Sequence, residues 1–366
     1  MSFQIKIKRD TATDFETANT VLANGEFSLE TDTGKMKVGN GSTAYNDLQF
    51  VTGNAARRLY IFEATTSVYL AGGTTNGDIT EIHKMPVASQ DSWSDIGDLL
   101  YYQPGKGSGG FNDESGNGYV ISASVQSPTK VVFASDSVSS LLTIGSYRSG
   151  AAYNGNQLAA YWVGGNPKVT TGKYVYASGA VTNTIPGMGI TTNLSDPAGS
   201  RGYLSGAPSG TFAFSIGGGN NTAASSTRIE KLNMSTEAGG SIDVGNLTIA
   251  THETTATAGE THAYSVGGRN FPEASGHKKT MDKIAFATDG NATDIGDLVI
   301  GRAYGAATSS TSYGFLSGGE GHTSSPYSTL PATTERWPFA SDSSSSNIPA
   351  SMPSSSRKNY RATMND

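Results

Sequence analysis

The chain of 366 residues contains no cysteine, and this absence excludes several kinds of chemistry. Without thiols there is no disulfide, no thiolate nucleophile and no zinc site built on cysteine. Charged residues are scarce at 15%, against a usual share of about 25%. The net charge is -6, and no local basic patch offsets it, so we expect neither nucleic acid nor an anionic membrane as a partner.

Long apolar runs are also missing. No apolar stretch approaches the roughly 18 residues of a membrane-spanning helix, so we expect no membrane insertion. Lys6, Lys8 and Arg9 are not followed by the apolar segment of a signal peptide, which indicates synthesis in a cytoplasm without export. No run keeps a 3.6-residue apolar period long enough for an amphipathic helix.

Glycine is abundant instead, with 46 residues, and it marks a cycle that is clearest from residue 261 to 311. Short runs alternate apolar side chains with small or polar ones and end at Gly, Asp, Asn or Ser, as half-buried antiparallel strands do. Four runs fill about fifty residues and predict one four-stranded sheet, which cannot bury its apolar face alone. Radial stacking of such sheets gives a β-propeller.

Two markers give the number of copies. The first is a strand that ends in paired glycines or a degenerate form of them, at 69–73, 119–123, 161–165, 214–218, 262–268 and 313–319. The second is the strand that follows, at 81–85, 130–134, 173–177, 228–232, 281–287 and 335–340. A third run recurs at 95–99, 243–247 and 294–298. We therefore predict an all-β protein with about six blades, in which the paired glycines mark crowded turns that tolerate no Cβ.

An arginine followed by small residues opens several units, as at Arg148–Ala152, Arg201–Gly202 and Arg302–Ala303. Together with the paired glycines, this cycle resembles kelch-like propeller repeats. The Tyr and Trp that usually follow the glycines in kelch repeats are missing. The resemblance therefore implies the broad class of fold.

Two segments at opposite ends of the chain compete for one strand position. Arg58–Glu63 stands before the first copy, in the place that the strand at Arg302 takes before the last copy. Arg357–Thr363, which comes after the last copy, is a second candidate for the same strand position. We expect one of the two to complete a sheet begun at the other end of the chain, because that removes an open edge.

Residues 1–54 differ from the repeats and hold few large apolar side chains. Phe3, Ile5 and Ile7 alternate with polar residues as in a two-faced strand. Residues 10–19 read as a polar, one-turn helical connection, and residues 26–30 and 35–38 as a hairpin. So small a core predicts that this unit packs against copies of itself or a partner.

Several ordered blocks in this segment, at 8–12, 19–26, 30–41 and 43–48, resemble the N-terminal domain of bacteriophage major tropism determinants, a module also found on tail fibres. Phe15 and Tyr45 stand where such modules often carry Trp. The resemblance implies a virion tail protein whose module, residues 1–54, forms a homotrimer or docks on other tail or baseplate proteins. Residues 55–366 would then form the propeller that the module presents outward.

Motifs for catalysis or metal binding are weak. Residues 289–294 offer oxygens as a calcium loop does but lack its glycine and final acid, so a turn is preferred and structural calcium stays open. The five histidines, at 83, 252, 262, 277 and 322, are not at metal-ligand spacing. Asp98, Glu114, Asp243 and Asp297 are possible glycosidase carboxylates, although turns explain all but Glu114. Gly217–Asn220 lacks the residues of a phosphate loop. We predict no catalytic residue, metal or cofactor.

Loops that mix aromatic residues with Asn, Ser and Gly are the candidates for ligand contact. Residues 269–280 and 320–334 follow the paired glycines of consecutive copies, so we expect them side by side on one face, carrying Phe271 and Tyr327. Residues 105–118, with Phe111, precede their strand and should project from the opposite face. The sequence therefore predicts Phe271 and Tyr327, or alternatively Phe111, as contacts for a host cell-surface glycan or protein.

These features predict a virion protein of the tail-fibre or receptor-binding type that is not an enzyme. Two alternatives stay open. One is a purely architectural baseplate or collar component, and the other is a virion-associated glycan depolymerase.

Overall fold

The computed structural model forms two units, Met1–Arg58 and Leu59–Asp366. It describes residues 7–33, 35–48, 63–64, 66–73, 80–100, 108–113, 115–122, 129–140, 152–156, 158–164, 171–182, 184–186, 188, 201–219, 225–270, 276–321, 332–352 and 362–365. The boundary expected near residue 54 falls outside these ranges. Strands dominate the described residues, so the all-β class is confirmed.

In the first unit, β2 (Phe27–Glu30) runs parallel to β1 (Lys8–Asp10) and antiparallel to β3 (Met36–Val38). The helix α1 (Ala12–Ala18) begins at Thr11, whose Oγ1 accepts a hydrogen bond from the amide of Asp14 at 3.2 Å. A short 3-10 helix follows at Tyr45–Asp47. The predicted hairpin is confirmed, and the connection expected to make one helical turn is a seven-residue helix.

Among the described residues of the first unit, four side chains form the core: Phe15, Leu22, Tyr45 and Leu48. The rings of Phe15 and Tyr45 stack with centroids 4.7 Å apart. Val21 and Phe27 are large apolar side chains that stay exposed on this unit. The core is therefore as small as the sequence suggested.

The described strands of the second unit form five sheets of four strands, one of five strands and a two-stranded ribbon. The first sheets contain β5 (Ser67–Ala71), β6 (Glu81–Pro86) and β7 (Ser94–Asp98) with the C-terminal β30 (Ala362–Asn365); β8 (Ser108–Asn112), β9 (Asn117–Ser122), β10 (Thr129–Val132) and β11 (Ser137–Ser140); and β12 (Ala152–Gly155), β13 (Ala159–Val163), β14 (Thr171–Val175) and β15 (Val181–Thr182).

The later sheets contain β16 (Ser205–Pro208), β17 (Phe212–Ile216), β18 (Ser226–Asn233) and β19 (Ile242–Thr251); β20 (Thr255–Ala258), β21 (His262–Val266), β22 (Thr280–Ala285) and β23 (Thr293–Asp297); and β25 (Ala306–Ser310), β26 (Tyr313–Ser317), β28 (Thr333–Pro338) and β29 (Ser346–Ser351), with β4 (Glu63–Ala64) beside β25. The ribbon pairs β24 (Arg302–Ala303) with β27 (Glu320–Gly321). The six copies counted in the sequence correspond to these six sheets.

Every one of the six sheets repeats the same cross-strand pair, an aromatic residue opposite a basic residue. The pairs are Tyr69–Lys84, Tyr119–Lys130, Tyr161–Lys173, Phe214–Lys231, Tyr264–Lys283 and Phe315–Arg336. Cross-strand pairs of this kind stabilise a sheet and help to fix its register.

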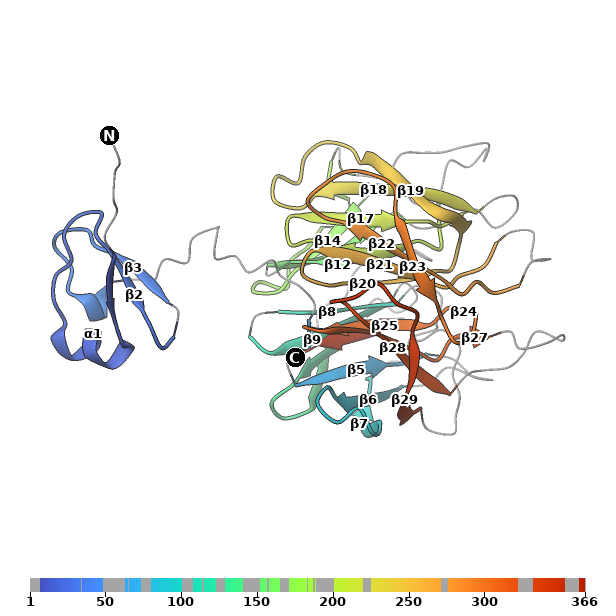
Figure 1. Ribbon diagram of the computed structural model, residues 1–366, viewed down its shortest axis with the longest axis horizontal. Coiled ribbons are helices and arrows are strands. Elements are labelled where there is room, and N and C mark those ends of the chain that lie inside the picture. Colours follow the sequence, from blue (N-terminus) through green and yellow to red (C-terminus); the bar gives the residue numbers. More distant parts are fainter. Residues whose placement is uncertain are drawn as a thin grey trace. The chain divides into compact units, whose positions relative to one another are not determined.

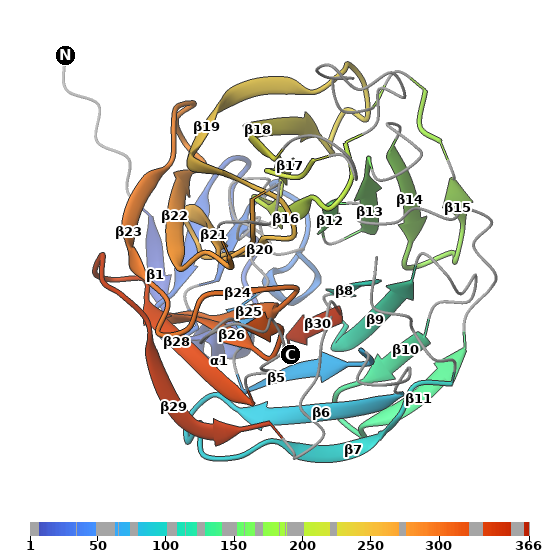
Figure 2. The ribbon, with the colours of Figure 1, turned by 90° about the vertical axis from the view of Figure 1, so that its right-hand side faces the viewer.

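The first strands of the six sheets contact one another in a cyclic order. β8 contacts β12, and contacts continue through β16, β20, β25 and β30 back to β8. Figure 2 shows these strands around a common centre, with the remaining strands of each sheet farther out. Apolar clusters fill the space between consecutive sheets, as where Phe214 and Ile229 pack with Ala263 and Ile284. Each sheet thus buries its apolar face against the next.

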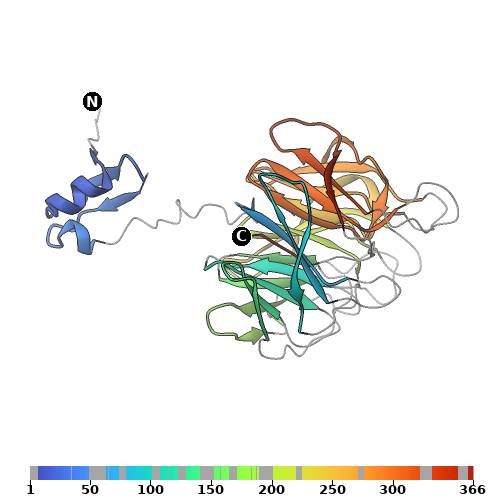
Figure 3. The same cartoon turned by 90° about the horizontal axis from the view of Figure 1, so that it is seen from below.

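The C-terminal segment supplies the first strand of the sheet that contains β5. β30 pairs antiparallel with β5, with Ala362 opposite Ala71, and the two lie side by side in Figures 1 and 3. β4 instead lies parallel to β25, with Glu63 opposite Ser309. The prediction that one terminal segment completes a sheet begun at the other end is therefore confirmed, and the C-terminal segment is the one that does so.

Most of the basic residues of the cross-strand pairs also reach a turn in the next sheet, and we call each such contact a latch. The latches are Lys84–Asp136 at 3.2 Å, Lys173–Glu237 at 2.6 Å, Lys231–Asp289 at 2.5 Å, Lys283–Asp342 at 2.5 Å and Arg336–Gln90. The turns have related sequences, such as Phe133–Asp136 and Phe339–Asp342. Lys130 has no such latch among the described contacts: the corresponding turn of the next sheet is Tyr176–Gly179, where Gly179 stands at the acidic position.

Candidate functional site

The predicted contact residues fall in different places. Phe271 and Tyr327 lie outside the described residues, although the first residues of their loops are described: Arg269 bridges to His252, and Glu320 pairs with Ala303. Both loops therefore leave from the ends of strands that carry the paired glycines.

The interpretation of Phe111 as a loop residue is wrong. It lies in β8 with no exposed surface and packs against Tyr119, Ala160, Trp162 and Tyr174. The connection between β8 and β9 does lie at the strand end opposite to the paired glycines. The aromatic ring itself is fixed by the core, because a residue in the middle of an alternating strand points to one face of the sheet.

The paired glycines hold consecutive sheets together through the backbone. The amide of Gly268 donates to the carbonyl of Arg302, which opens the next unit, at 2.8 Å. Gly267 has φ +66, and a Cβ there would lie 2.3 Å from the same carbonyl oxygen. The predicted reason for the paired glycines, a crowded turn without room for a Cβ, is confirmed at this position.

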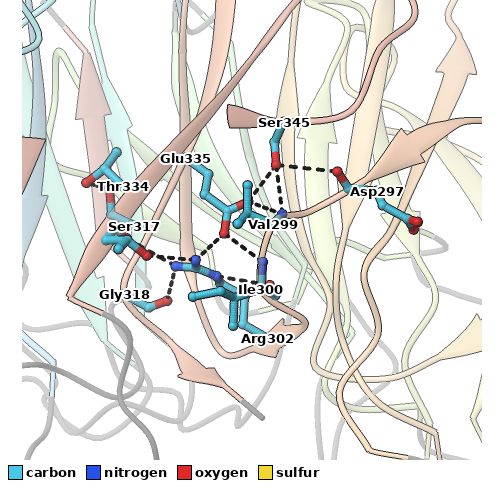
Figure 4. A network of polar contacts seen from close by, with 10 residues as sticks. Asp297, Val299, Ile300, Arg302, Ser317, Gly318, Thr334, Glu335 and Ser345 are labelled. Atoms are coloured by element: carbon cyan, nitrogen blue, oxygen red, sulfur yellow. Dashed lines mark hydrogen bonds and ion pairs between the residues drawn. The ribbon is translucent and has the colours of Figure 1, made fainter. Parts of the chain in front are cut away.

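The side chain of the same Arg302 takes part in a buried ion pair (Figure 4). The Arg302 and Glu335 side chains are both fully buried and form an ion pair. Arg302 Nη1 also donates to the carbonyls of Gly318 at 3.0 Å and Thr333 at 3.1 Å. Burial lowers the pKa of Arg302, against the attraction of Glu335. The opening arginine of the repeat thus lies in the ribbon of β24 and β27 and joins it to Glu335 of β28, whereas the first strand of the larger sheet begins at Ala306.

Glu335 also accepts hydrogen bonds from the segment that follows β23 of the preceding sheet. The amides of Val299 and Ile300 donate to its two oxygens at 2.8 and 3.2 Å, and Ser345 donates through its hydroxyl. A buried carboxylate is tolerated when each oxygen is paired in this way. The network therefore joins three segments that are distant in the sequence (Figure 4).

Two neighbouring sheets carry versions of this arrangement. In one, Arg201 pairs with the fully buried Glu230 at 2.7 Å, and burial lowers the pKa of Arg201 to about 10, so it stays charged at neutral pH. In the other, Thr251 stands in the arginine position. Asp282, which holds the position of Glu335 in this sheet, instead accepts hydrogen bonds from the amide and the hydroxyl of Thr248. Burial raises the pKa of Asp282, although these hydrogen bonds lower it.

Two residues after each of these opening positions, the backbone adopts a left-handed conformation. Tyr203, Glu253 and Tyr304 have φ values of 55°, 57° and 58°, which are uncommon outside glycine and cost energy. The amide of Glu253 donates to the carbonyl of Tyr203, and that of Tyr304 to the carbonyl of Glu253, both at 3.2 Å. These three residues, which we call the arc, directly precede the first strands β16, β20 and β25.

The side chains around the arc form one polar cluster. The carboxylate of Glu253, only 3% exposed, accepts from the hydroxyl of Tyr304 and from Arg269 Nη2, the latter at 2.9 Å. Arg269 Nη2 also lies 2.9 Å from the Tyr304 hydroxyl, and its guanidinium stacks over that ring. The ring of His252 meets the half-buried Tyr203 edge-on, and its Nδ1 lies 2.8 Å from Ser225 Oγ.

This cluster can supply donors, acceptors and aromatic faces to a polar ligand. Left-handed backbone can mark functional sites, but it also recurs at Gln90, Asp136 and Glu237 of the latch turns, so the polar side chains of the cluster, rather than its backbone, distinguish it. The sequence analysis noted Arg201 and Arg302 but missed Tyr203 and Tyr304 two positions later. The repeated spacing was a signal for them, whereas Glu253 and Arg269 follow no such pattern.

Other carboxylates considered for catalysis have structural partners. Asp98 accepts from the Thr80 hydroxyl, and Asp243 from the amide of Gly245 at 3.3 Å. Asp294 accepts from the amide of Gly296 at 2.9 Å, and Asp289 pairs with Lys231. Residues 289–292 lie in the connection between β22 and β23, whereas Asp294 lies in β23 itself. Gly217 and Gly218 have positive φ values, as the turn interpretation of these glycines requires. Glu114 lies outside the described residues.

Comparison with solved structures finds a similar fold. The protein titled "Structure of YjhT" matches with a TM-score of 0.56 and 12% sequence identity, over 72% of this chain and 88% of that one. At this identity the likeness concerns the fold alone. No curated protein matches this chain. Within the part of the chain that is described, we find no helix that combines the length and apolarity needed to cross a membrane.

The comparison with family models bears on the first unit. Residues 5–43 match the major tropism determinant N-terminal domain. This segment includes β1, α1, β2 and β3 and most of the blocks on which the sequence resemblance rests. The match indicates a bacteriophage protein of the tropism or tail-fibre type, with a first unit similar to the major tropism determinant N-terminal domain.

Proposed function

We propose that the chain is a phage tail protein that binds the host surface through its second unit while its first unit assembles on the tail. The match of residues 5–43 to the tropism determinant domain is the observation that supports this most directly. The division of the chain at residue 58 supports a separate assembly module. Partners on the tail side would be other tail or baseplate proteins.

The second unit, in this proposal, is a six-bladed β-propeller with kelch-like character. Its support is the cyclic contact of the six first strands and the regular latches between consecutive sheets. Closing the ring leaves no sheet edge unpaired at the join between first and last sheets.

Recognition is assigned to the end of the second unit that carries the paired glycines. The arc and its cluster lie there, and so do the first residues of the two loops with Phe271 and Tyr327. Loops held by a rigid frame are the usual carriers of binding residues. A host glycan or surface protein with exposed hydroxyl and amide groups fits a surface of aromatic, amide and guanidinium groups.

The test is binding of the fluorescently labelled full chain to cells of the phage's host. Phe271→Ala, Tyr327→Ala and Tyr203→Ala should each weaken binding and leave the unfolding transition in place. Leu158→Ser, at an exposed turn on the other end of the sheets, is the matched control. Binding that survives all three changes and falls only with changes in residues 1–54 would favour the architectural alternative. Sustained release of new reducing ends from envelope polysaccharide would favour a depolymerase.

The first unit is proposed to form a homotrimer. Its four-residue core and the exposed Val21 and Phe27 favour packing against copies of itself. Light scattering should give three subunits for the full chain and one for a chain that starts at Leu59. Equal subunit counts for the two would exclude the first unit as the trimerising element.

A further inference from the structure

A second cluster of polar side chains lies in the first sheet, between β6 and β7. Glu81 and His83 are two positions apart on β6, so their side chains share one face of the sheet. Asp95 on β7 is paired directly with His83 and shares that face. His83 Nε2 lies 3.7 Å from Glu81 Oε2. One donor atom from each of the three residues lies within 4.8 Å of the other two.

Comparison with the other sheets makes this cluster unusual. The strand position of His83 is held in three other sheets by a buried carboxylate, Glu230, Asp282 or Glu335, and arginine or amide groups compensate it. In the first sheet the position carries an imidazole, 1% exposed. The residue two positions earlier is an acid there, whereas it is Arg228, Thr280 or Thr333 in the other three. Where these three sheets carry a buried carboxylate, the first sheet thus places a buried imidazole close to two carboxylates.

We propose that Glu81, His83 and Asp95 bind a divalent first-row transition metal ion, for which Zn²⁺ is the probe. Imidazole nitrogen with carboxylate oxygens suits zinc, whereas Ca²⁺ and Mg²⁺ prefer oxygen donors alone. Zinc ligands lie about 2.0–2.2 Å from the ion, so the 3.7 Å separation of Nε2 and Oε2 already fits two ligands of one ion. Asp95 has one oxygen, Oδ1, engaged with the amide of Gly97 at 3.0 Å and offers its carboxylate from the outer strand.

Three protein ligands leave a fourth position for water or for a donor from a bound partner. The ion would join β6 to the outermost strand of its sheet. Because it binds the folded chain, it would also raise the unfolding temperature, and this rise would continue with the logarithm of the free Zn²⁺ concentration above the dissociation constant.

The experiment is zinc titration of the EDTA-treated and dialysed full chain, followed by calorimetry and by thermal unfolding. We expect one Zn²⁺ per chain and a higher unfolding temperature, with no comparable response to Mg²⁺. His83→Gln, Glu81→Gln and Asp95→Asn should each weaken zinc binding by at least about tenfold, since even a group behind a ligand contributes about that much.

Asp294→Asn is the matched control, because Asp294 occupies the Asp95 position opposite Asp282. It should bind zinc as the parent does. Asp95 is exposed on an outer strand, so Asp95→Asn tests the site even if His83→Gln does not fold. Absence of zinc binding by the parent chain, or zinc binding that is unchanged in Asp95→Asn and Glu81→Gln, would overturn the proposal.

Discussion

The indole Nε1 of Trp93 donates a hydrogen bond to Thr334 Oγ1 at 3.0 Å, although 241 positions separate the two residues. This bond crosses from the connection between β6 and β7 to β28, and the amide of Ala350 donates to the carbonyl of Gln90 close by. The first and last sheets in the chain are therefore direct neighbours.

Thr334→Val should lower the free energy of unfolding by about 1 to 3 kcal/mol, because it keeps the shape of the side chain but leaves the buried indole N–H without an acceptor. Urea denaturation of the two proteins measures the difference. Thr293→Val, on the exposed face of β23, is the control and should change the midpoint little. A parent-like midpoint for Thr334→Val would show that this bond adds nothing to the join.

Removal of residues 362–366 should destabilise the second unit strongly. It takes away β30 and leaves the groups of β5 that pair with it unpaired, at a cost of about 1 to 3 kcal/mol for each that stays buried. Since domain stabilities are about 5 to 15 kcal/mol, the thermal unfolding midpoint should fall markedly. An unchanged midpoint in the shortened chain would contradict a structural role for β30.

Glu335→Gln should cost about 3 to 5 kcal/mol, because it leaves the buried charge of Arg302 uncompensated. Its amide nitrogen would also face the amides of Val299 and Ile300 with a donor. Asp342→Asn removes a carboxylate of similar chemistry from a half-exposed latch and should cost only about 0 to 1 kcal/mol. Guanidinium denaturation measures the loss in free energy of unfolding for both variants. Equal losses would contradict a special role for the buried pair of Arg302 and Glu335.

Gly179→Asp should give Lys130 an acidic partner in the next sheet and so create the missing latch. Gly179 has φ +67, and Asp136 occupies the equivalent turn position at φ 51, so Asp fits this backbone. Gly179→Asn is the matched comparison, since it differs only in charge. We expect the Asp variant to be more stable than the Asn variant by about 0.2 to 1 kcal/mol at low salt. The difference should disappear in 1 M salt, because salt screens exposed ion pairs. A difference that persists in 1 M salt would not come from an ion pair between Lys130 and Asp at position 179.

The Lys173–Glu237 latch should be sensitive to acid. Burial tends to raise the pKa of Glu237, but hydrogen bonds from Lys173 and Tyr161 outweigh it and hold that pKa below its ordinary 4.5. A lowered folded-state pKa means that the stabilisation is present above about pH 4.5 and is lost as pH falls through the lowered value. The stability gap between the parent and Lys173→Met should therefore shrink below pH 4.5. Lys130→Met should show no such trend in the same pH range, because Gly179 replaces the acid in the corresponding turn of the next sheet.

Strand positions and the number of sheets were predictable because each strand carries its own pattern. Tyr264 and Lys283, for example, lie in alternating runs whose period is set by the pleat of a strand. The paired glycines could likewise be interpreted as crowded turns. A Cβ at Gly267 would clash with the carbonyl oxygen of Arg302, so only glycine fits this turn.

Contacts between sheets were not predictable from such local patterns. Phe111 lies between glycine-rich segments that read as a loop, yet it fills a core built from two sheets. The burial of Arg302 depends on Glu335, and the cluster of Glu253 with Arg269 depends on two loops meeting. Only the repeated Arg-x-Tyr spacing at 201–203 and 302–304 carried information about the arc.

The position of β30 has a consequence for synthesis on the ribosome. The strand that β5 needs as its partner is translated about 290 residues after β5, so the first sheet keeps an unprotected edge until β30 emerges. Pairings between such distant segments close slowly. The contacts described for the first unit lie within residues 7–48, so this unit can fold well before β30 emerges, and the homotrimer proposed for it would be able to form at that stage. Assembly of the module can therefore precede completion of the domain that it carries.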